Sequence, residues 1–399
     1  MDPESMGFPS PESSVETVSP ERLKCRIDGG EGVTLLDVRM TGEFDSWRIE
    51  GESVESVNVP YFEFLDEELP ETVLEAIPDD EHVTVLCAKG GASEYVAGAL
   101  ADRGYDVDHL EEGMNGWASL YDAHEVTRYE GSGYVLQYQR PSSGCLGYLV
   151  VGDEEAAVID PLRAFADRYL ADAEDRGVEL THAFDTHVHA DHFSGLRELA
   201  AEGVEGVLPA AAAERGITYG DEVTLADDGD RFHVGEVTIE AVATPGHTSG
   251  MTSYLIDDVF LATGDALFVE SVARPDLEEG DDGAPAAART LHRSLHERIL
   301  ALDDHVLFGG AHVSGRARPA ADGTYTATIG ETKDRMEALS LDEEAFVELV
   351  LSDMPPRPAN HEEIVEANLG RREVGDEEAF TLELGPNNCA ASRDALASD

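Results

Sequence analysis

The chain has 399 residues, a formal net charge of -57 at pH 7 and a hydrophobic content of 42%. That length allows two or three domains with full-sized cores, and the hydrophobic content predicts a globular rather than a disordered chain. So acidic a surface repels nucleic acid and anionic membranes, which argues against both as partners.

The acidic residues are spread along the whole chain instead of being gathered in one tail. This distribution is typical of a halophilic surface, where counterions at high salt screen the self-repulsion. The chain lacks an apolar stretch of about 18 residues and a secretory signal, so we expect a cytoplasmic protein without membrane partners. The four cysteines are far apart and include no CxxC pair, which disfavours a disulfide framework or a cysteine-rich zinc site.

The first part of the chain predicts an α/β domain over residues 16–122. Residues 1–15 are rich in Ser, Pro and Glu and indicate a disordered arm before it. Ser19 is the expected N-cap of the first helix, with Pro20 in its first turn. Strand and helix patterns then alternate, which predicts a parallel sheet with flanking helices; the strands are expected at 33–38 and 83–86 and a helix at 93–103. The unit closes near Trp117, and the acidic segment 121–125 is expected to connect it to the rest.

A different pattern predicts a second domain over residues 123–399. Residues 148–151 and 156–160 flank a Gly-Asp turn, which predicts a β-hairpin. Helices and short strands alternate after it. One amphipathic helix is marked by Leu291, Leu295 and Ile299, and a strand is expected at 306–308.

The first candidate site is Cys87, which ends the strand expected at 83–86. Small residues follow it as far as Ser93, where a helix opens. Such a loop curls so that backbone N–H groups point at the sulfur, and the helix N-terminus adds positive potential. Both effects favour the reactive thiolate and would hold a bound persulfide. The loop residues expected to do so are Lys89, Gly90, Gly91 and Ser93.

This segment resembles the active loop of the rhodanese sulfurtransferases. The resemblance also includes the segments at residues 35–39, 43–44, 58–60 and 110–117. It implies that Cys87 carries sulfane sulfur, in the short form of loop that goes with sulfur transfer. Many members of the family have an arginine where this loop has Ala92. Asp37 and Arg39 are expected to pair with each other as structural residues, and Trp117 is expected in the core.

The strongest pattern in the chain is the run from Thr186 to His192, which contains three histidines and one aspartate. These groups are costly to bury together unless a cation joins them. Three more candidate ligands follow expected strand ends: His247 in TPGHT, Asp265 in TGD and His312 in GAH. Side chains just beyond strand ends can converge from separate segments. The sequence therefore predicts a metal centre.

The order HxHxDH, GHT, GD and AH resembles the metallo-β-lactamase superfamily, over about residues 130 to 370. The resemblance implies an αββα sandwich with the metal site along one edge of its two sheets. Six other histidines fall outside the pattern and are expected to be surface or core residues: His182, His233, His292, His296, His305 and His361.

Two reactions are compatible with this resemblance. In glyoxalase II, two Zn(II) ions hold a hydroxide that attacks a thioester carbonyl. That reaction would make zinc ligands of the residues His189, Asp191, His192 and His312. In the persulfide dioxygenases, one Fe(II) per chain would bind His187, His247 and Asp265, the donor set of non-haem oxygenases. The four residues named for zinc would then orient the iron ligands.

Several segments favour the persulfide dioxygenases. Residues 266–276 resemble that family's segment after its aspartate, which implies that Arg274 binds a substrate carboxylate; the alternative is a surface salt bridge between Arg274 and Asp276. The C-terminal segments at 328–333, 343–347, 354–358 and 367–370 also fit. A persulfide-making domain beside a persulfide-oxidising one is coherent chemistry.

The implied partners are a low-molecular-weight thiol persulfide and dioxygen, which would yield sulfite and free thiol. Cys87 would exchange sulfane sulfur with the same pool, thiosulfate is a further candidate substrate, and a homodimer is left open. A third hypothesis is a non-enzymatic sulfur carrier or sensor, which binds metal without turnover and keeps a stable persulfide on Cys87.

Overall fold

The structure is a computed structural model that describes residues 13–65, 71–78, 81–313, 317–352 and 354–391. Its internal contacts divide the chain into two units, Met1–Leu120 with Arg140–Ser143, and Tyr121–Gln139 with Gly144–Asp399. Most of the arm expected at residues 1–15 lies outside the described residues. Within the described part, Ser13 donates its backbone N–H to Asp102 at 2.8 Å and Val15 packs against the core. Contact with the folded unit therefore begins before residue 16.

The first unit is built on a parallel sheet with the strand order β1-β5-β4-β2-β3. Its strands are β1 (Glu16–Val18), β2 (Val33–Asp37), β3 (Val54–Asn58), β4 (Val83–Leu86) and β5 (Val107–Leu110). Its helices are α1 (Pro20–Asp28), α2 (Thr41–Ser46), α3 (Glu71–Ala76), α4 (Gly91–Ala101), α5 (Gly113–Ala118) and the short 3-10 turn η2 (Tyr61–Phe64). The expected α/β class and the Ser19 cap are confirmed, since Ser19 Oγ accepts from the N–H of Arg22 at 3.3 Å.

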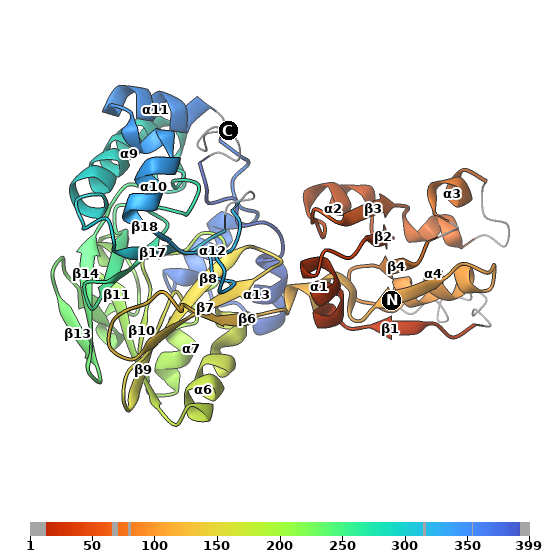
Figure 1. The fold of residues 1–399 in the computed structure, drawn as a ribbon, viewed down its shortest axis with the longest axis horizontal. Helices are drawn as coiled ribbons and strands as arrows, with labels where there is room; N and C mark the ends of the chain where they lie inside the picture. The colour runs from red at the N-terminus through yellow and green to blue at the C-terminus, as the bar shows by residue number, and fades with distance from the viewer. Residues whose placement is uncertain (1–12, 66–70, 79–80, 314–316, 353, 392–399) are drawn as a thin grey trace. The chain divides into compact units, whose positions relative to one another are not determined.

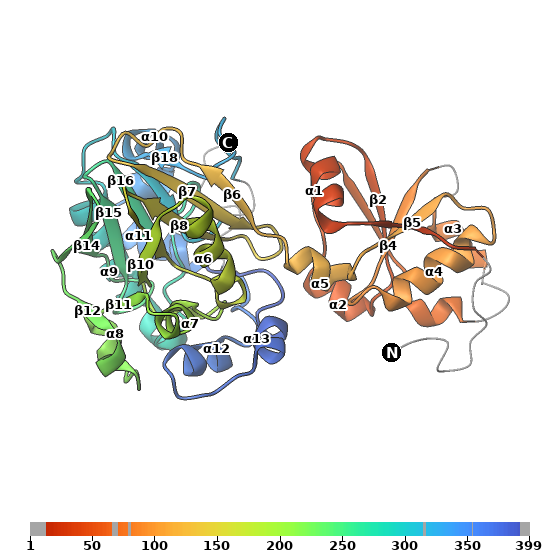
Figure 2. The ribbon, with the colours of Figure 1, turned by 90° about the horizontal axis from the view of Figure 1, so that it is seen from below.

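Alternate residues of the buried strands face opposite sides of this sheet, because side chains in a strand point up and down in turn. Leu35 and Leu86 pack with Leu23 of α1 and with Trp117 of α5. On the other face, Leu36 and Val85 pack with α4 and α3 through side chains that include Val96, Leu100 and Val73. Helices thus cover both faces (Figure 2), and Trp117 lies in the core as expected.

The second unit contains two sheets, with strand orders β12-β11-β10-β9-β8-β7-β6 and β13-β14-β15-β16-β17-β18. The strands of the first are β6 (Asp122–Glu125), β7 (Tyr134–Arg140), β8 (Cys145–Val151), β9 (Glu155–Ile159), β10 (Glu179–Phe184), β11 (Glu205–Pro209) and β12 (Thr224–Ala226). The strands of the second are β13 (Arg231–Val234), β14 (Val237–Ala243), β15 (Thr252–Ile256), β16 (Phe260–Gly264), β17 (Leu307–Gly310) and β18 (Ala327–Thr328).

The helices of this unit are α6 (Ala166–Asp175), α7 (Leu196–Ala201), α8 (Ala210–Glu214), α9 (Gly280–Ser294), α10 (Ile329–Arg335), α11 (Glu343–Ser352), α12 (His361–Asn368) and α13 (Asp376–Leu382). Short turns are η3 (Arg163–Phe165), η4 (Gly220–Glu222), the π-helical η5 (Leu295–Ile299) and η6 (Glu337–Ser340). None of the helices in the described residues has the length and apolarity that a membrane crossing needs.

Side chains that alternate in direction along each strand pack on both faces of the two sheets and so form the layers of the sandwich. Tyr148 and Val150 of β8 pack between the two sheets, where Ile239 and Phe260 of the other sheet meet them. Leu149 on the opposite face of β8 packs under α6 and α7. The outer face of the second sheet, which contains β13 to β18, is covered by α9 and α11 through residues such as Leu291 and Phe346. Figure 1 shows these helices outside the two sheets, so the αββα sandwich is confirmed.

The expected hairpin is present as β8 and β9, and the expected helix as α9 continued by η5. Residues 121–125 directly follow the first unit, as expected, but Asp122–Glu125 also forms a strand that the sequence did not predict, β6, antiparallel to β7 at the edge of the sheet. None of the four residues of this edge strand is fully buried, so its apolar alternation is too weak to reveal it.

Candidate functional site

The candidate metal ligands lie on loops that follow four strands of the sandwich. His187 follows β10, His247 follows β14, Asp265 directly follows β16 and His312 follows β17. Gly264, with φ +53°, lets the loop of Asp265 approach the loop of His187, since a Cβ there would lie 2.5 Å from Thr186 Oγ1. The side chains of these four ligands are at most 3% exposed.

Three of these side chains, His187, His247 and Asp265, form a group that we call the trio. The donor atoms of the trio all lie within 4.8 Å of one another. Asp265 Oδ2 is 3.8 Å from His187 Nε2 and 3.4 Å from His247 Nε2. All three of these atoms are buried and have no hydrogen-bond partner. Buried polar atoms are otherwise almost always satisfied, so the trio fits a cation bound between them.

The outward atoms of the trio are held by hydrogen bonds. Thr186 Oγ1 donates to Asp160 Oδ2 at 3.0 Å and accepts from His187 Nδ1 at 2.9 Å. His247 Nδ1 donates to the backbone carbonyl of Arg274 at 2.8 Å. In both histidines the proton therefore resides on Nδ1, and the lone pair of Nε2 faces the space between the three side chains of the trio.

Burial and neighbouring charges place the trio in the protonation state that a metal needs. Burial, and then the nearby His189, hold the pKa of His187 well below its ordinary value. Burial likewise lowers the pKa of His247. Burial raises the pKa of Asp265, but the stronger combined effect of His312, His247 and His187 lowers it. Two neutral imidazoles and one carboxylate result, and these are metal-binding forms.

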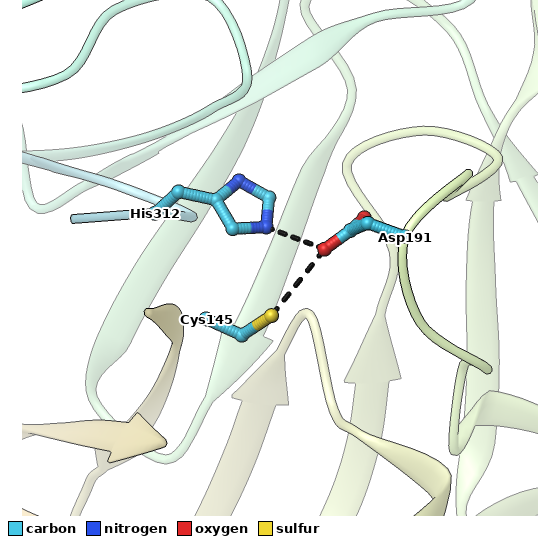
Figure 3. A group of neighbouring side chains, drawn as sticks. All are labelled: Cys145, Asp191 and His312. Carbon is cyan, nitrogen blue, oxygen red and sulfur yellow. Dashed lines mark hydrogen bonds and ion pairs between the residues drawn. The ribbon is translucent and has the colours of Figure 1, made fainter. Parts of the chain in front are cut away.

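His312 lies between two carboxylates. Its Nδ1 donates to Asp265 Oδ1 at 2.7 Å and its Nε2 donates to Asp191 Oδ2 at 2.8 Å (Figure 3). Burial lowers the pKa of His312, but the two aspartates together raise it well above the ordinary value. Both nitrogens of His312 are therefore engaged by carboxylates.

His189 and His192 lie beside the trio. His189 Nε2 is 3.2 Å from Asp160 Oδ1 and 3.7 Å from Asp185 Oδ1, and these carboxylates raise its pKa against the effect of burial. The donor atoms of His189, Asp191 and His192 also lie within 4.8 Å of one another. These residues thus surround the trio, as both sequence hypotheses require.

Arg274 is only 1% exposed, and its guanidinium is committed to protein groups. Nε and Nη2 donate to the two oxygens of Asp276 at 2.7 and 3.0 Å, and Nη1 donates to the carbonyls of Pro356 and Asn388. The salt bridge weighed as the alternative is present, but it is buried and not on the surface. A substrate carboxylate would have to displace Asp276 to reach this side chain.

The Cys87 loop forms the second candidate site, in the first unit. The N–H of Gly90 donates to Cys87 Sγ at 3.1 Å, and the thiol lies 3.4 Å from Ser93 Oγ. Gly90 has φ +89° and Gly91 begins α4, so the loop curls around the sulfur at the start of the helix. Lys89 is exposed at the rim. Arg39 is paired with Asp37 at 2.6 Å, which confirms the expected pairing of these two buried residues.

Sequence reasoning missed four residues of the metal region. Asp160 and Asp185 each follow a strand end, the signal that identified His247 and Asp265, but neither belongs to a motif. Cys145 and Cys389 are buried beside His312, and the donor atoms of each lie within 4.8 Å of His312 and an aspartate. Their wide sequence separation concealed this convergence. The six histidines outside the pattern take part in none of the metal-binding groups among the described residues.

Two family models match the chain. The Rhodanese-like domain model matches residues 19–120, and the Metallo-beta-lactamase superfamily model matches residues 142–312.

Relatives of two activities align with the chain. Persulfide dioxygenase ETHE1, mitochondrial, of Bos taurus is 30% identical over 252 residues, which cover 61% of this chain and 92% of that protein. The hydroxyacylglutathione hydrolase of Methylococcus capsulatus is 33% identical over 257 residues, which cover 62% and 90%. Among solved structures, ETHE1 from Myxococcus xanthus matches with a TM-score of 0.50 and 28% identity, covering 59% of this chain and 98% of that one. A metallo-beta-lactamase from Staphylococcus aureus matches with a TM-score of 0.55 and 25% identity, covering 61% and 74%.

Proposed function

Since the chain belongs to the metallo-β-lactamase superfamily, is of the persulfide dioxygenase type and carries a rhodanese-like domain, we propose that it oxidises a low-molecular-weight thiol persulfide at one Fe(II) per chain. One persulfide, one dioxygen and one water would yield one thiol, one sulfite and two protons. The iron ligands would be His187, His247 and Asp265. When bound, Fe(II) supplies the redox chemistry that couples dioxygen reduction to sulfur oxidation.

The observation that carries this proposal is the buried trio of His187, His247 and Asp265, whose inward donor atoms have no hydrogen-bond partner. Both nitrogens of His312 donate to aspartates, so a second ion at His312 would have to replace one of these hydrogen bonds. The trio has three inward donor atoms without partners, and His189 Nε2 and Asp191 Oδ1 beside it also lack partners. The proposal is supported by the donor set of the trio, two histidines and one carboxylate, which is that of the non-haem iron oxygenases.

The residues around the trio would keep it ordered and dry. Thr186 and the carbonyl of Arg274 hold the histidine rings by Nδ1, and His312 holds the outer oxygen of Asp265. Burial of all three ligands excludes bulk water, which strengthens electrostatic interactions at the site. Cys87 would carry sulfane sulfur in the first unit, where the N–H of Gly90 stabilises a charged sulfur.

A second candidate is a dinuclear zinc thioester hydrolase, which the 33% identity to a hydroxyacylglutathione hydrolase favours. It would use His189, Asp191, His192 and His312 as ligands. For that, His312 would have to leave at least one aspartate. The two candidates differ in metal content and in the need for dioxygen.

The test is elemental analysis of anaerobically purified protein, followed by oxygen uptake with glutathione persulfide. The proposal predicts one iron per chain and one dioxygen consumed per sulfite formed. His247→Ala should abolish uptake, whereas His182→Ala, which changes a histidine of β10 outside the trio, should retain it. Two zinc ions per chain with thioester hydrolysis and no oxygen uptake would replace the dioxygenase by the hydrolase.

A further inference from the structure

The edge of the first unit's sheet that carries Cys87 also exposes apolar side chains. Among the described residues, three large apolar side chains are exposed: Met40 at 49%, Phe62 at 45% and Leu225 at 37%. Met40 follows β2, and Phe62 lies in η2 after β3; we call this pair the apolar rim. We propose that Cys87 accepts sulfane sulfur from a persulfide with an uncharged, apolar body that contacts the apolar rim, in preference to thiosulfate. This specificity rests on the proposed role of Cys87 as a sulfur carrier.

Backbone hydrogen bonds place the apolar rim beside the loop of Cys87. The strands β4, β2 and β3 are parallel neighbours in that order, so their carboxyl ends lie at one edge of the sheet. The N–H of Val38 donates to the carbonyl of Leu86, the residue before Cys87, at 2.9 Å. The N–H of Tyr61, the residue before Phe62, donates to the carbonyl of Val38 at 2.9 Å. The exposed apolar side chains and the sulfur site therefore share one edge.

The surroundings of the sulfur are apolar as well. Cys87 belongs to a cluster of buried apolar side chains, against which Tyr61 and Ala92 pack. Its polar neighbours are the N–H of Gly90 at 3.1 Å and the hydroxyl oxygen of Ser93 at 3.4 Å, and that hydroxyl already donates to the carbonyl of Gly90. These groups suit one charged sulfur. The three oxygens of a bound thiosulfate would lose water against apolar side chains, which is costly without further donors.

The charged groups of this edge do not favour a dianion. Arg39 follows β2, but its Nε and Nη2 are held by the carboxylate of Asp37. Lys89 is exposed in the loop, and the exposed Glu111 and Glu112 follow β5, the strand next to β4, at the same edge. These carboxylates offset the lysine and repel thiosulfate and its product sulfite, whereas they leave an uncharged persulfide unaffected.

The transfer is balanced without an oxidant or a reductant. The Cys87 thiolate attacks the outer sulfur of R–S–SH, and the S–S bond of the donor breaks. The proton of the outer sulfur passes to the departing sulfur to give R–SH, and Cys87 is left as a persulfide anion beside the N–H of Gly90. Because Cys87 is only 6% exposed, the narrow S–S end of the donor enters the site and the body R stays outside, at the apolar rim.

A matched pair of donors separates charge from reactivity. Benzyl persulfide and para-carboxybenzyl persulfide differ by one carboxylate that is remote from the sulfur. Each donor, or thiosulfate, is mixed anaerobically with the full chain, and loading of Cys87 is followed as the mass gain of one sulfur atom, with Cys87→Ser as background. At about 2 M KCl, where long-range repulsion is screened, we expect benzyl persulfide to load about 10-fold faster than its carboxylate analogue, and thiosulfate to be the slowest.

The double variant Met40→Ser/Phe62→Ser tests the apolar rim, and both positions are exposed enough for the fold to persist. It should slow loading from benzyl persulfide about 10-fold, the effect of roughly two methylene groups of covered surface, and leave loading from thiosulfate unchanged. Leu225→Ser is the matched control, because it removes the third exposed apolar side chain, in the other unit, and should change neither rate.

Ala92→Arg tests the missing cation. Ala92 is half-buried one residue before Ser93, and an arginine there should raise loading from thiosulfate about 10-fold; the exposed rim positions carry the test if this arginine is not accommodated. Equal rates for the two benzyl donors, or an unchanged rate in the rim variant, would overturn the preference and leave the carrier role intact. If no donor placed sulfur on Cys87, the carrier role itself would be refuted, and the preference with it. Oxygen uptake at the trio enters neither result.

Discussion

His247 Nδ1 donates to the backbone carbonyl of Arg274 at 2.8 Å, so the loop of Arg274 determines how a candidate iron ligand faces the trio. That loop is held in turn by the Arg274 side chain, which spans Asp276 and the carbonyls of Pro356 and Asn388. Arg274 thus acts on the metal centre through its backbone, while its guanidinium ties three segments together.

Arg274→Ala should therefore damage the fold and the metal centre together. It removes one partner of a buried ion pair, which costs about 3 kcal/mol of unfolding free energy. The carbonyl that holds His247 would also lose its anchor, and the affinity for metal should fall about 10- to 100-fold. Urea unfolding and chelator competition measure the two effects.

Arg357→Ala is the control, because Arg357 also contacts Asp276, at 2.9 Å, but its side chain is 35% exposed. It should cost much less stability and leave the affinity for metal unchanged. If Arg274→Ala instead kept its stability and metal affinity and only raised the KM for persulfide, Arg274 would be the substrate-binding residue that the sequence predicts.

Thr186 makes a similar link to His187. Thr186→Val keeps the shape of the side chain but removes the hydroxyl that bridges His187 Nδ1 and Asp160. We expect a loss of about 1–2 kcal/mol in stability and a 10- to 100-fold loss in metal affinity, because the ring loses its orienting partner. Thr186→Ser should restore both. If Thr186→Val bound metal as tightly as the wild-type chain, packing alone would be holding the His187 ring in place.

Much of this architecture is predictable from residue patterns. The histidines of the metal centre and Asp265 can be predicted because each follows a strand end in a recognisable motif. Cys87 can be predicted because a Gly-Gly loop follows it. The alternation of strand and helix patterns also predicts sheets covered by helices. Strands such as β8 and β9 are recognisable because nearly all of their residues are buried and apolar.

The missed features depend on contacts between distant segments. Cys145 reaches His312 only through pairing of backbones that are far apart in sequence, and no local pattern encodes such pairing. The same holds for Arg274, whose guanidinium meets Asn388 across 114 positions. An arginine beside a recognisable motif looks like a ligand-binding residue until the burial of its partners is known.

The net charge of -57 predicts a dependence of stability on salt. The Debye length is about 10 Å at 0.1 M salt and about 3 Å at 1 M, so added salt screens repulsion between carboxylates of the folded surface. Each kcal/mol gained should raise Tm by about 2–4 °C for a domain of this size, and we expect a rise on the order of 10 °C between 0.1 and 2 M KCl. Calorimetry measures it. An equal rise in sucrose of matched osmolality, or no rise at all, would contradict adaptation by surface charge.

The sulfur-carrying loop should fail when Gly113 gains a methyl group. Gly113 has φ +56°, and a Cβ there would lie 2.0 Å from the carbonyl oxygen of Cys87. Gly113→Ala must therefore push Cys87 away from the N–H of Gly90, the donor that faces its sulfur. We expect cyanide-labile sulfur on Cys87, measured after incubation with thiosulfate or a thiol persulfide, to fall at least 10-fold, because the distorted loop no longer stabilises the charged sulfur.

Gly91→Ala is the matched control, since Gly91 is exposed at the start of α4 and a Cβ there meets nothing within 4 Å. It should load sulfur like the wild-type chain, and neither variant should change metal binding at the trio, which lies in the other unit. Full loading of Gly113→Ala would mean that the contact between Gly113 and Cys87 does not shape the loop. Equal loss in both variants would instead point to the start of α4, and not to the position of the Cys87 backbone, as the element that holds sulfur.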